Sequence, residues 1–123
     1  MTIEEAKALV LREGLAGENA PDDAAFVLLH FGDVPDQERM AHLLKALRII
    51  CDGLQGETIL NRPLAAALWT LGNSSNECLL DCERYARKYP DGAMDDVLKL
   101  IMAVEGVFYG APFEGLKIAV KEG

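Results

Sequence analysis

The spacing of apolar residues between Asp36 and Leu54 constrains the fold more than any other feature of the chain. Apolar side chains recur there at intervals of three and four residues: Met40, Leu43, Leu44, Leu47, Ile50, Cys51 and Leu54. This spacing places them on one side of an α-helix, and charged side chains flank that stripe. The stretch therefore predicts an amphipathic helix that packs against other helices.

Residue types that start and stop helices divide the rest of the chain into further helical segments. Side chains that can cap a helix start stand at six places: Thr2 with Glu5, Asp22 or Asp23, Asp36, Asn61, Ser74 with Glu77, and Asp91. Stop signals follow them: Gly14, Gly32, Gly53, Gly72, Pro90 and Gly110. Besides the helix after Asp36, these signals predict helices over about residues 3–13, 24–31, 64–71 and 74–86, and a last one beginning at or just beyond Asp91.

The links between most of these segments are short, which favours antiparallel neighbours packed as hairpins. The sequence thus predicts one all-α domain over residues 1–123, with about six helices in an irregular bundle. A small HEAT-like stack is the variant, because the helix pairs beginning near Asp36 and Ser74 are about forty residues apart. Residues 111–123 are expected to form a short extended arm, since apolar residues alternate at Leu116, Ile118 and Val120. The arm either covers the domain or docks a partner.

Three expectations concern the core. Residues 24–31 are apolar nearly all round, so the segment should lie in the interior, as a helix or as a buried strand. Trp69 stands among alanines and leucines and is expected to be a core anchor more than a binding hot spot. The last helix should bury a broad apolar face: Met94, Val97, Leu98, Ile101, Met102, Val104 and Phe108.

The whole chain has a formal net charge of −8, and its acidic residues are concentrated in one part of the sequence. The stretch from Glu13 to Glu38 contains no lysine or arginine and holds seven acids: Glu13, Glu18, Asp22, Asp23, Asp33, Asp36 and Glu38. A field of a single sign speeds the encounter with a partner of opposite charge. We expect a protein partner with a basic surface, and the candidate partner-binding residues are Glu18, Asp22, Asp23, Asp33, Asp36 and Glu38.

Composition argues against several other classes. A pI near 4.7 opposes direct binding to nucleic acid, whose phosphates would be repelled. The longest uncharged apolar run is too short to span a bilayer, and the N-terminus is acidic, so a cytoplasmic protein without membrane contact is expected. Three cysteines are an odd number and are expected to be reduced. No cofactor is expected, and the oligomeric state is left open, with a homodimer as one possibility.

Candidate catalytic groups each have a plainer interpretation. Cys78 and Cys82 lie one helical turn apart, but structural zinc requires four ligands, so we expect apolar core cysteines. His42 follows Glu38 by four residues, which would suit a general base, although a surface contact explains the pair equally simply. Two pairs of adjacent acids stand in predicted first turns, where negative charge complements the helix dipole: Asp22 with Asp23, and Asp95 with Asp96. We therefore predict no catalytic and no metal-binding residues.

Size, acidity, helical pattern and the absence of a signal segment together resemble the small cytoplasmic immunity proteins by which bacteria neutralise their own toxins. The resemblance implies a non-catalytic binding protein that blocks a toxin's active site, often a nuclease with a basic substrate groove, with the acidic stretch imitating a nucleic-acid backbone. Two alternatives come from other classes. One is an adaptor or chaperone for a secreted effector that uses the arm at residues 111–123. The other is a small hydrolase or metal enzyme that uses His42 with Glu38.

Overall fold

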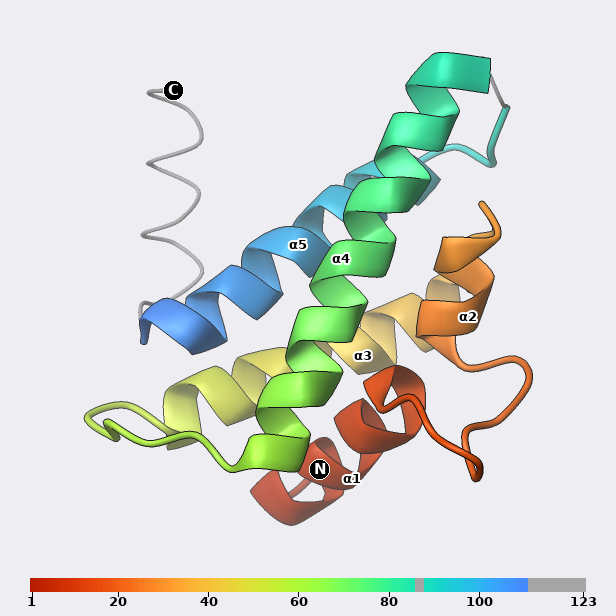
Figure 1. The fold of residues 1–123 in the computed structure, drawn as a ribbon. Helices are drawn as coiled ribbons and strands as arrows, with labels where there is room; N and C mark the ends of the chain where they lie inside the picture. The colour runs from red at the N-terminus through yellow and green to blue at the C-terminus, as the bar shows by residue number, and fades with distance from the viewer. Residues whose placement is uncertain (86–87, 111–123) are drawn as a thin grey trace.

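The computed structural model describes residues 1–85 and 88–110, and five helices lie within them (Figure 1). They are α1 (Ile3–Gly14), α2 (Ala25–His30), α3 (Gln37–Gly53), α4 (Arg62–Tyr85) and α5 (Ala93–Tyr109). No strand occurs in the described ranges, which confirms the all-α prediction. The arm predicted for residues 111–123 lies outside the described residues.

Three of the predicted helix starts are capped as their residue types imply. The Thr2 hydroxyl accepts from the Glu5 backbone N–H at 3.1 Å, and the Glu5 carboxylate accepts from the Thr2 N–H at 3.1 Å, which completes a capping box for α1. Asp36 accepts from the Arg39 N–H at 2.9 Å, and Asn61 accepts from the Leu64 N–H at 3.2 Å. Local chemistry thus fixes where α1, α3 and α4 begin.

The capping box makes one part of the stability depend on pH. Hydrogen bonds from Thr2, first from its backbone N–H and then from its hydroxyl, lower the pKa of Glu5 below its ordinary value of 4.5. Because the folded pKa lies below the unfolded one, this contribution is complete above about pH 4.5 and is lost as the pH falls through the folded pKa. We expect Glu5→Gln to lower the melting temperature near neutral pH, and the difference from the wild type to shrink in acid. Glu4→Gln changes the same charge in the same turn outside the capping box and is the control; an equal pH dependence for both variants would contradict the prediction.

The two helices predicted on either side of Gly72 are one continuous helix, so the predicted stop and the second capping box at Ser74 were wrong. Ser74 and Ser75 are buried within α4, and the Ser75 hydroxyl donates to the Leu71 carbonyl oxygen at 2.7 Å. This bond to the preceding turn satisfies the hydroxyl inside the helix. Gly72 faces α5 instead of ending a helix, since a Cβ there would lie 3.4 Å from Val104 Cγ1.

Helix α2 is short and only one of its sides is buried. Its N-cap is Ala24, which makes no side-chain capping bond, so the predicted caps at Asp22 and Asp23 were wrong. Leu29 is fully buried, whereas Phe31 just beyond the helix is 67% exposed. A six-residue helix that packs chiefly on α4, with a smaller contact to α1, does not bury its residues all round. The expectation that the whole segment is interior was therefore too broad.

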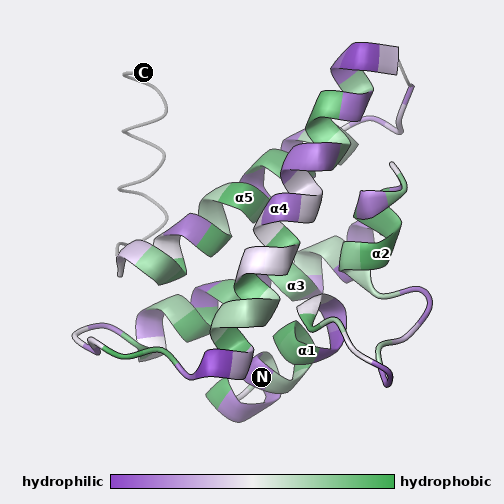
Figure 2. Cartoon of the chain, in the orientation of Figure 1, coloured by the Kyte–Doolittle hydropathy of each residue, from purple (hydrophilic) through white to green (hydrophobic). Residues whose placement is uncertain are grey.

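The helices pack across the chain more than as consecutive hairpins. The principal pairs are α1 with α3 and α4, α2 with α4, α3 with α5, and α4 with α5. Hairpin packing was predicted for most neighbouring helices, and in the described part of the chain it is wrong for α2 with α3 and for α3 with α4. Figure 2 shows hydrophobic segments on every helix and hydrophilic segments in the loops on both sides of α4. No helix within the described ranges is both long enough and apolar enough to cross a membrane.

The buried faces of α4 and α5 differ from those predicted. The buried side of α4 consists of Leu64, Ala67, Leu68, Leu71, Ser74, Ser75 and Cys78. Trp69 lies on the opposite side and is 64% exposed, so its prediction as a core anchor was wrong. In α5, Leu98 and Phe108 are exposed, while Leu100 and Val107 are buried in their place. Both errors have one cause: size and apolarity were weighed above the angular position that the helical period assigns.

Candidate functional site: an acidic cleft between two connections

A cleft of about 640 Å³ lies where the connection from α2 to α3 meets the connection from α4 to α5. The two connections approach each other at the upper right of Figure 1. The described residues that line the cleft come from both: Leu28, Gly32, Asp33, Val34, Pro35, Asp36, Gln37, Lys88, Tyr89, Pro90, Asp91, Ala93 and Asp96. The cleft joins acidic residues from distant parts of the sequence.

One hydrogen bond ties the two walls of the cleft together. The Tyr89 hydroxyl donates to the Gly32 carbonyl oxygen at 2.6 Å. Gly32 has a φ of 80°, a left-handed conformation that glycine adopts without strain, and this turns the chain sharply after α2. The Asp33 N–H then donates back to the Leu28 carbonyl oxygen at 2.7 Å. The turn and the tyrosine therefore hold Asp33 and Asp91 on opposite sides of one opening.

The cleft combines negative charge with an apolar lining. Four aspartates border it: Asp33, Asp36, Asp91 and Asp96. Lys88 is the one cation among the described lining residues, so negative charge is in excess. The apolar part of the wall comes from buried or half-buried side chains: Leu28, Val34, Pro35, Tyr89 and Ala93. This arrangement suits a long cationic side chain, whose alkyl stem contacts the apolar wall while its charged end meets the carboxylates.

The structure divides the predicted acidic surface instead of gathering it. Asp33 and Asp36 border the cleft. Glu18 borders a different hollow, beside the end of α1, and Glu38 is exposed in the first turn of α3. Asp22 and Asp23 are exposed in the loop between α1 and α2. Only two of the six candidate residues therefore belong to this site.

Glu13, the first acid of the stretch, faces the interior. Its side chain is 5% exposed, and both carboxylate oxygens lie 3.0 Å from Nη2 of Arg39. The Ala25 N–H donates to the same carboxylate at 3.4 Å. Arg39 also donates to the Asp23 carbonyl oxygen at 2.8 Å, and its Nη1 lies 3.9 Å from the Asp23 carboxylate. The cation that immediately follows the acidic stretch thus neutralises part of it from within the fold.

Sequence reasoning missed two members of the cleft. Asp91 was predicted only as a helix cap and Asp96 only as a first-turn acid. In the structure the N-cap of α5 is Gly92, whose φ of 82° is left-handed, so Asp91 is exposed and does not cap the helix. The available signal was the acidic character of the segment around Gly92, but its closeness to Asp33 depends on the tertiary fold.

The candidate catalytic groups are not assembled into a site. His42 and Glu38 are both exposed on α3. A different histidine contacts an acid: Nδ1 of His30 in α2 lies 2.6 Å from Oε2 of Glu77 in α4. Cys78 is buried and Cys82 is half-buried, and no group of three or more potential ligands able to hold a metal occurs in the described part of the chain.

Cation binding is accordingly the chemistry that the described cleft favours. Its lining offers carboxylates, one hydroxyl and apolar walls, and it contains no histidine or cysteine among the described residues. Comparisons with protein-family models, curated proteins and solved structures give no match for this chain.

Proposed function

We propose that this protein is a non-catalytic binding module of the immunity-protein kind, which neutralises a toxin by covering a basic active site with its acidic cleft. The observation that carries the proposal is the meeting of Asp33 and Asp36 with Asp91 and Asp96 around one apolar-lined opening. Carboxylates grouped in this way offer a basic groove a substitute for the phosphates of its substrate.

The rest of the site supports binding more than catalysis. An arginine or lysine that enters the cleft loses water, and the surrounding carboxylates replace that hydration with charge-assisted hydrogen bonds. The apolar wall adds contact area for the side-chain stem. The adaptor alternative depended on the arm at residues 111–123, which lies outside the described residues. The enzyme alternative depended on His42 with Glu38, which are both exposed on α3.

Neutralising two cleft aspartates should slow association with the partner. The variant is Asp33→Asn with Asp91→Asn, which preserves side-chain shape and leaves the Asp36 cap intact. Because long-range attraction is lost, we expect the association rate at low salt to fall about tenfold and its salt dependence to flatten. The partner is first captured from the host with the wild-type chain, identified by mass spectrometry and purified, and its association is then followed by stopped-flow fluorescence from low to moderate salt.

The control removes the same charge elsewhere. Glu57→Gln with Glu105→Gln alters two exposed acids outside the cleft and should leave the rate within about twofold of the wild type. Equal rates for the cleft variant and the wild type would place the interface elsewhere.

Producing the partner in cells with and without this chain tests the biological part of the proposal. We expect the partner alone to arrest growth, the wild-type chain to relieve the arrest, and the cleft variant to relieve it less. A partner that is harmless alone, or that is bound as an unfolded segment, would favour the adaptor alternative.

A further inference from the structure

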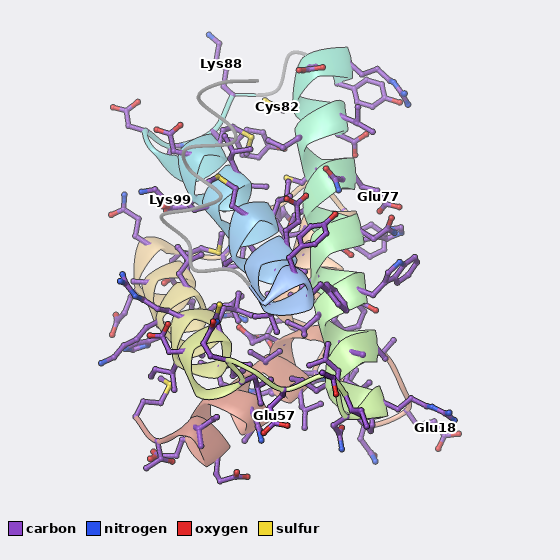
Figure 3. All side chains as sticks on the ribbon, turned by 90° about the vertical axis from the view of Figure 1, so that its left-hand side faces the viewer. Glu18, Glu57, Glu77, Cys82, Lys88 and Lys99 are labelled. Carbon is purple, nitrogen blue, oxygen red and sulfur yellow. The ribbon has the colours of Figure 1, made fainter. Side chains whose placement is uncertain are left out.

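One side of α4 carries a stripe of exposed residues that no other described helix covers. It lies opposite the buried side of the helix and contains Arg62, Ala66, Trp69, Asn73, Asn76, Leu80 and Arg84, all exposed. In Figure 1 α4 crosses in front of the other helices, and in Figure 3, turned by 90°, side chains of α4 project beyond the right-hand edge of the fold, on the side where Glu77 is labelled. The two views agree that this side of α4 faces outward.

The composition of the stripe differs from that of the chain. Although the net charge is −8, the stripe holds two arginines and no acid. Trp69 is 64% exposed and Leu80 is 54% exposed. Tryptophan and arginine are the residue types that most often dominate binding at protein interfaces. An exposed tryptophan and leucine on one helical stripe therefore indicate a contact surface.

We propose that this stripe is the interface of a homodimer in which two α4 helices pack antiparallel across a two-fold axis between Asn73 and Asn76. In that register Trp69 faces Leu80 of the partner subunit, and Asn73 faces Asn76 of the partner subunit, and each pair occurs twice. This register places an apolar pair at each end of the contact and reciprocal amide hydrogen bonds at its centre.

Charge at the ends of the contact supports a second copy as the occupant. Glu83 is exposed beside the stripe, and in this register it faces Ala66 of the partner subunit. Arg62 lies one helical turn beyond Ala66 on the same stripe, within reach of the partner's Glu83. Opposite charges thus meet at both ends. In this register each contact occurs twice, as an isologous interface requires.

Trp69 provides a direct test because it is the only tryptophan. Trp69 and Leu80 are eleven positions apart, about 16 Å along the helix axis, so Leu80 cannot contact Trp69 within one chain. As the full-length protein is concentrated from low micromolar to near-millimolar, we expect its emission maximum to move to shorter wavelength while sedimentation shows conversion of monomer to dimer. Leu80→Asp should weaken dimerisation about 30-fold or more and abolish the emission shift, an effect that can reach Trp69 only through the partner subunit.

Two further variants make the test specific. Ile59→Asp introduces the same change at an 83% exposed position outside α4 and should dimerise as the wild type does. Arg62→Glu and Glu83→Arg should each weaken the dimer about threefold, and the double variant should restore it. Circular dichroism confirms that each variant is folded. A monomer at every concentration, a dimer without the Trp69 shift, or a dimer that survives Leu80→Asp would overturn the proposal.

Discussion

Replacing Arg39 with alanine should lower the free energy of unfolding by about 3 kcal/mol. The Glu13 carboxylate is almost completely buried, and Nη2 of Arg39 lies 3.0 Å from both of its oxygens. Without the guanidinium, the buried Glu13 carboxylate loses its cation and keeps the hydrogen bond from the Ala25 N–H. The expected loss is at the lower end of the range for buried pairs because Arg39 itself is 30% exposed.

Urea denaturation followed by circular dichroism measures this loss. Lys45→Ala removes an exposed cation from the same helix and should change the free energy of unfolding by less than about 0.5 kcal/mol. Glu13→Gln with Arg39→Met removes both charges and should recover part of the loss. A stability of Arg39→Ala equal to that of the Lys45→Ala control would show that the Glu13 contact contributes nothing.

Replacing Gly14 with alanine should also destabilise the fold, by about 1–3 kcal/mol. A Cβ at Gly14 would lie 2.6 Å from the Ala67 carbonyl oxygen and 2.8 Å from Leu71 Cγ, so α1 must move away from α4. Helix propensity alone predicts the opposite sign, since alanine is favoured over glycine inside a helix by about 1 kcal/mol. The sign of the change therefore shows whether tertiary packing outweighs local preference.

Gly53→Ala is the matched control, because Gly53 is likewise the last residue of its helix. A Cβ there would meet only the end of the flexible Ile3 side chain, which can rotate away. We expect a neutral or slightly stabilising change, measured by thermal melting beside Gly14→Ala. Equal shifts for the two glycines would contradict the packing explanation.

Structural features that depend on a few neighbouring residues in the sequence could be predicted, and features that depend on neighbours in space could not. Thr2 and Asp36 cap their helices because the partners they bind are three residues away. Gly72 was predicted to stop a helix, but α5 packs against it, and the hydroxyl of the nearby Ser75 donates to the Leu71 carbonyl oxygen inside α4. Trp69 was predicted to be a core residue because its size and apolarity were considered without its angular position on α4.

The candidate site was half predictable for the same reason. Asp33 and Asp36 belong to a run of acids that is visible in the sequence, so their charge could be assigned to a binding surface. Asp91 joins them only because Tyr89 bonds to Gly32, fifty-seven positions earlier in the chain. Glu13 does not belong to the predicted acidic surface, because it is buried and paired with Arg39, which is one residue beyond the acidic stretch.

The central place of α4 has a consequence for how the protein is made. α1, α2 and α5 all pack against α4, and six residues are too few for α2 to be stable alone. While residues 1–53 are emerging from a ribosome, α1 and α3 can pair, but the side of α1 at Gly14 and the side of α2 that pack against α4 remain in water. A nascent chain that pauses before residue 62 therefore exposes apolar surface for a chaperone to bind, and folding is completed late in synthesis.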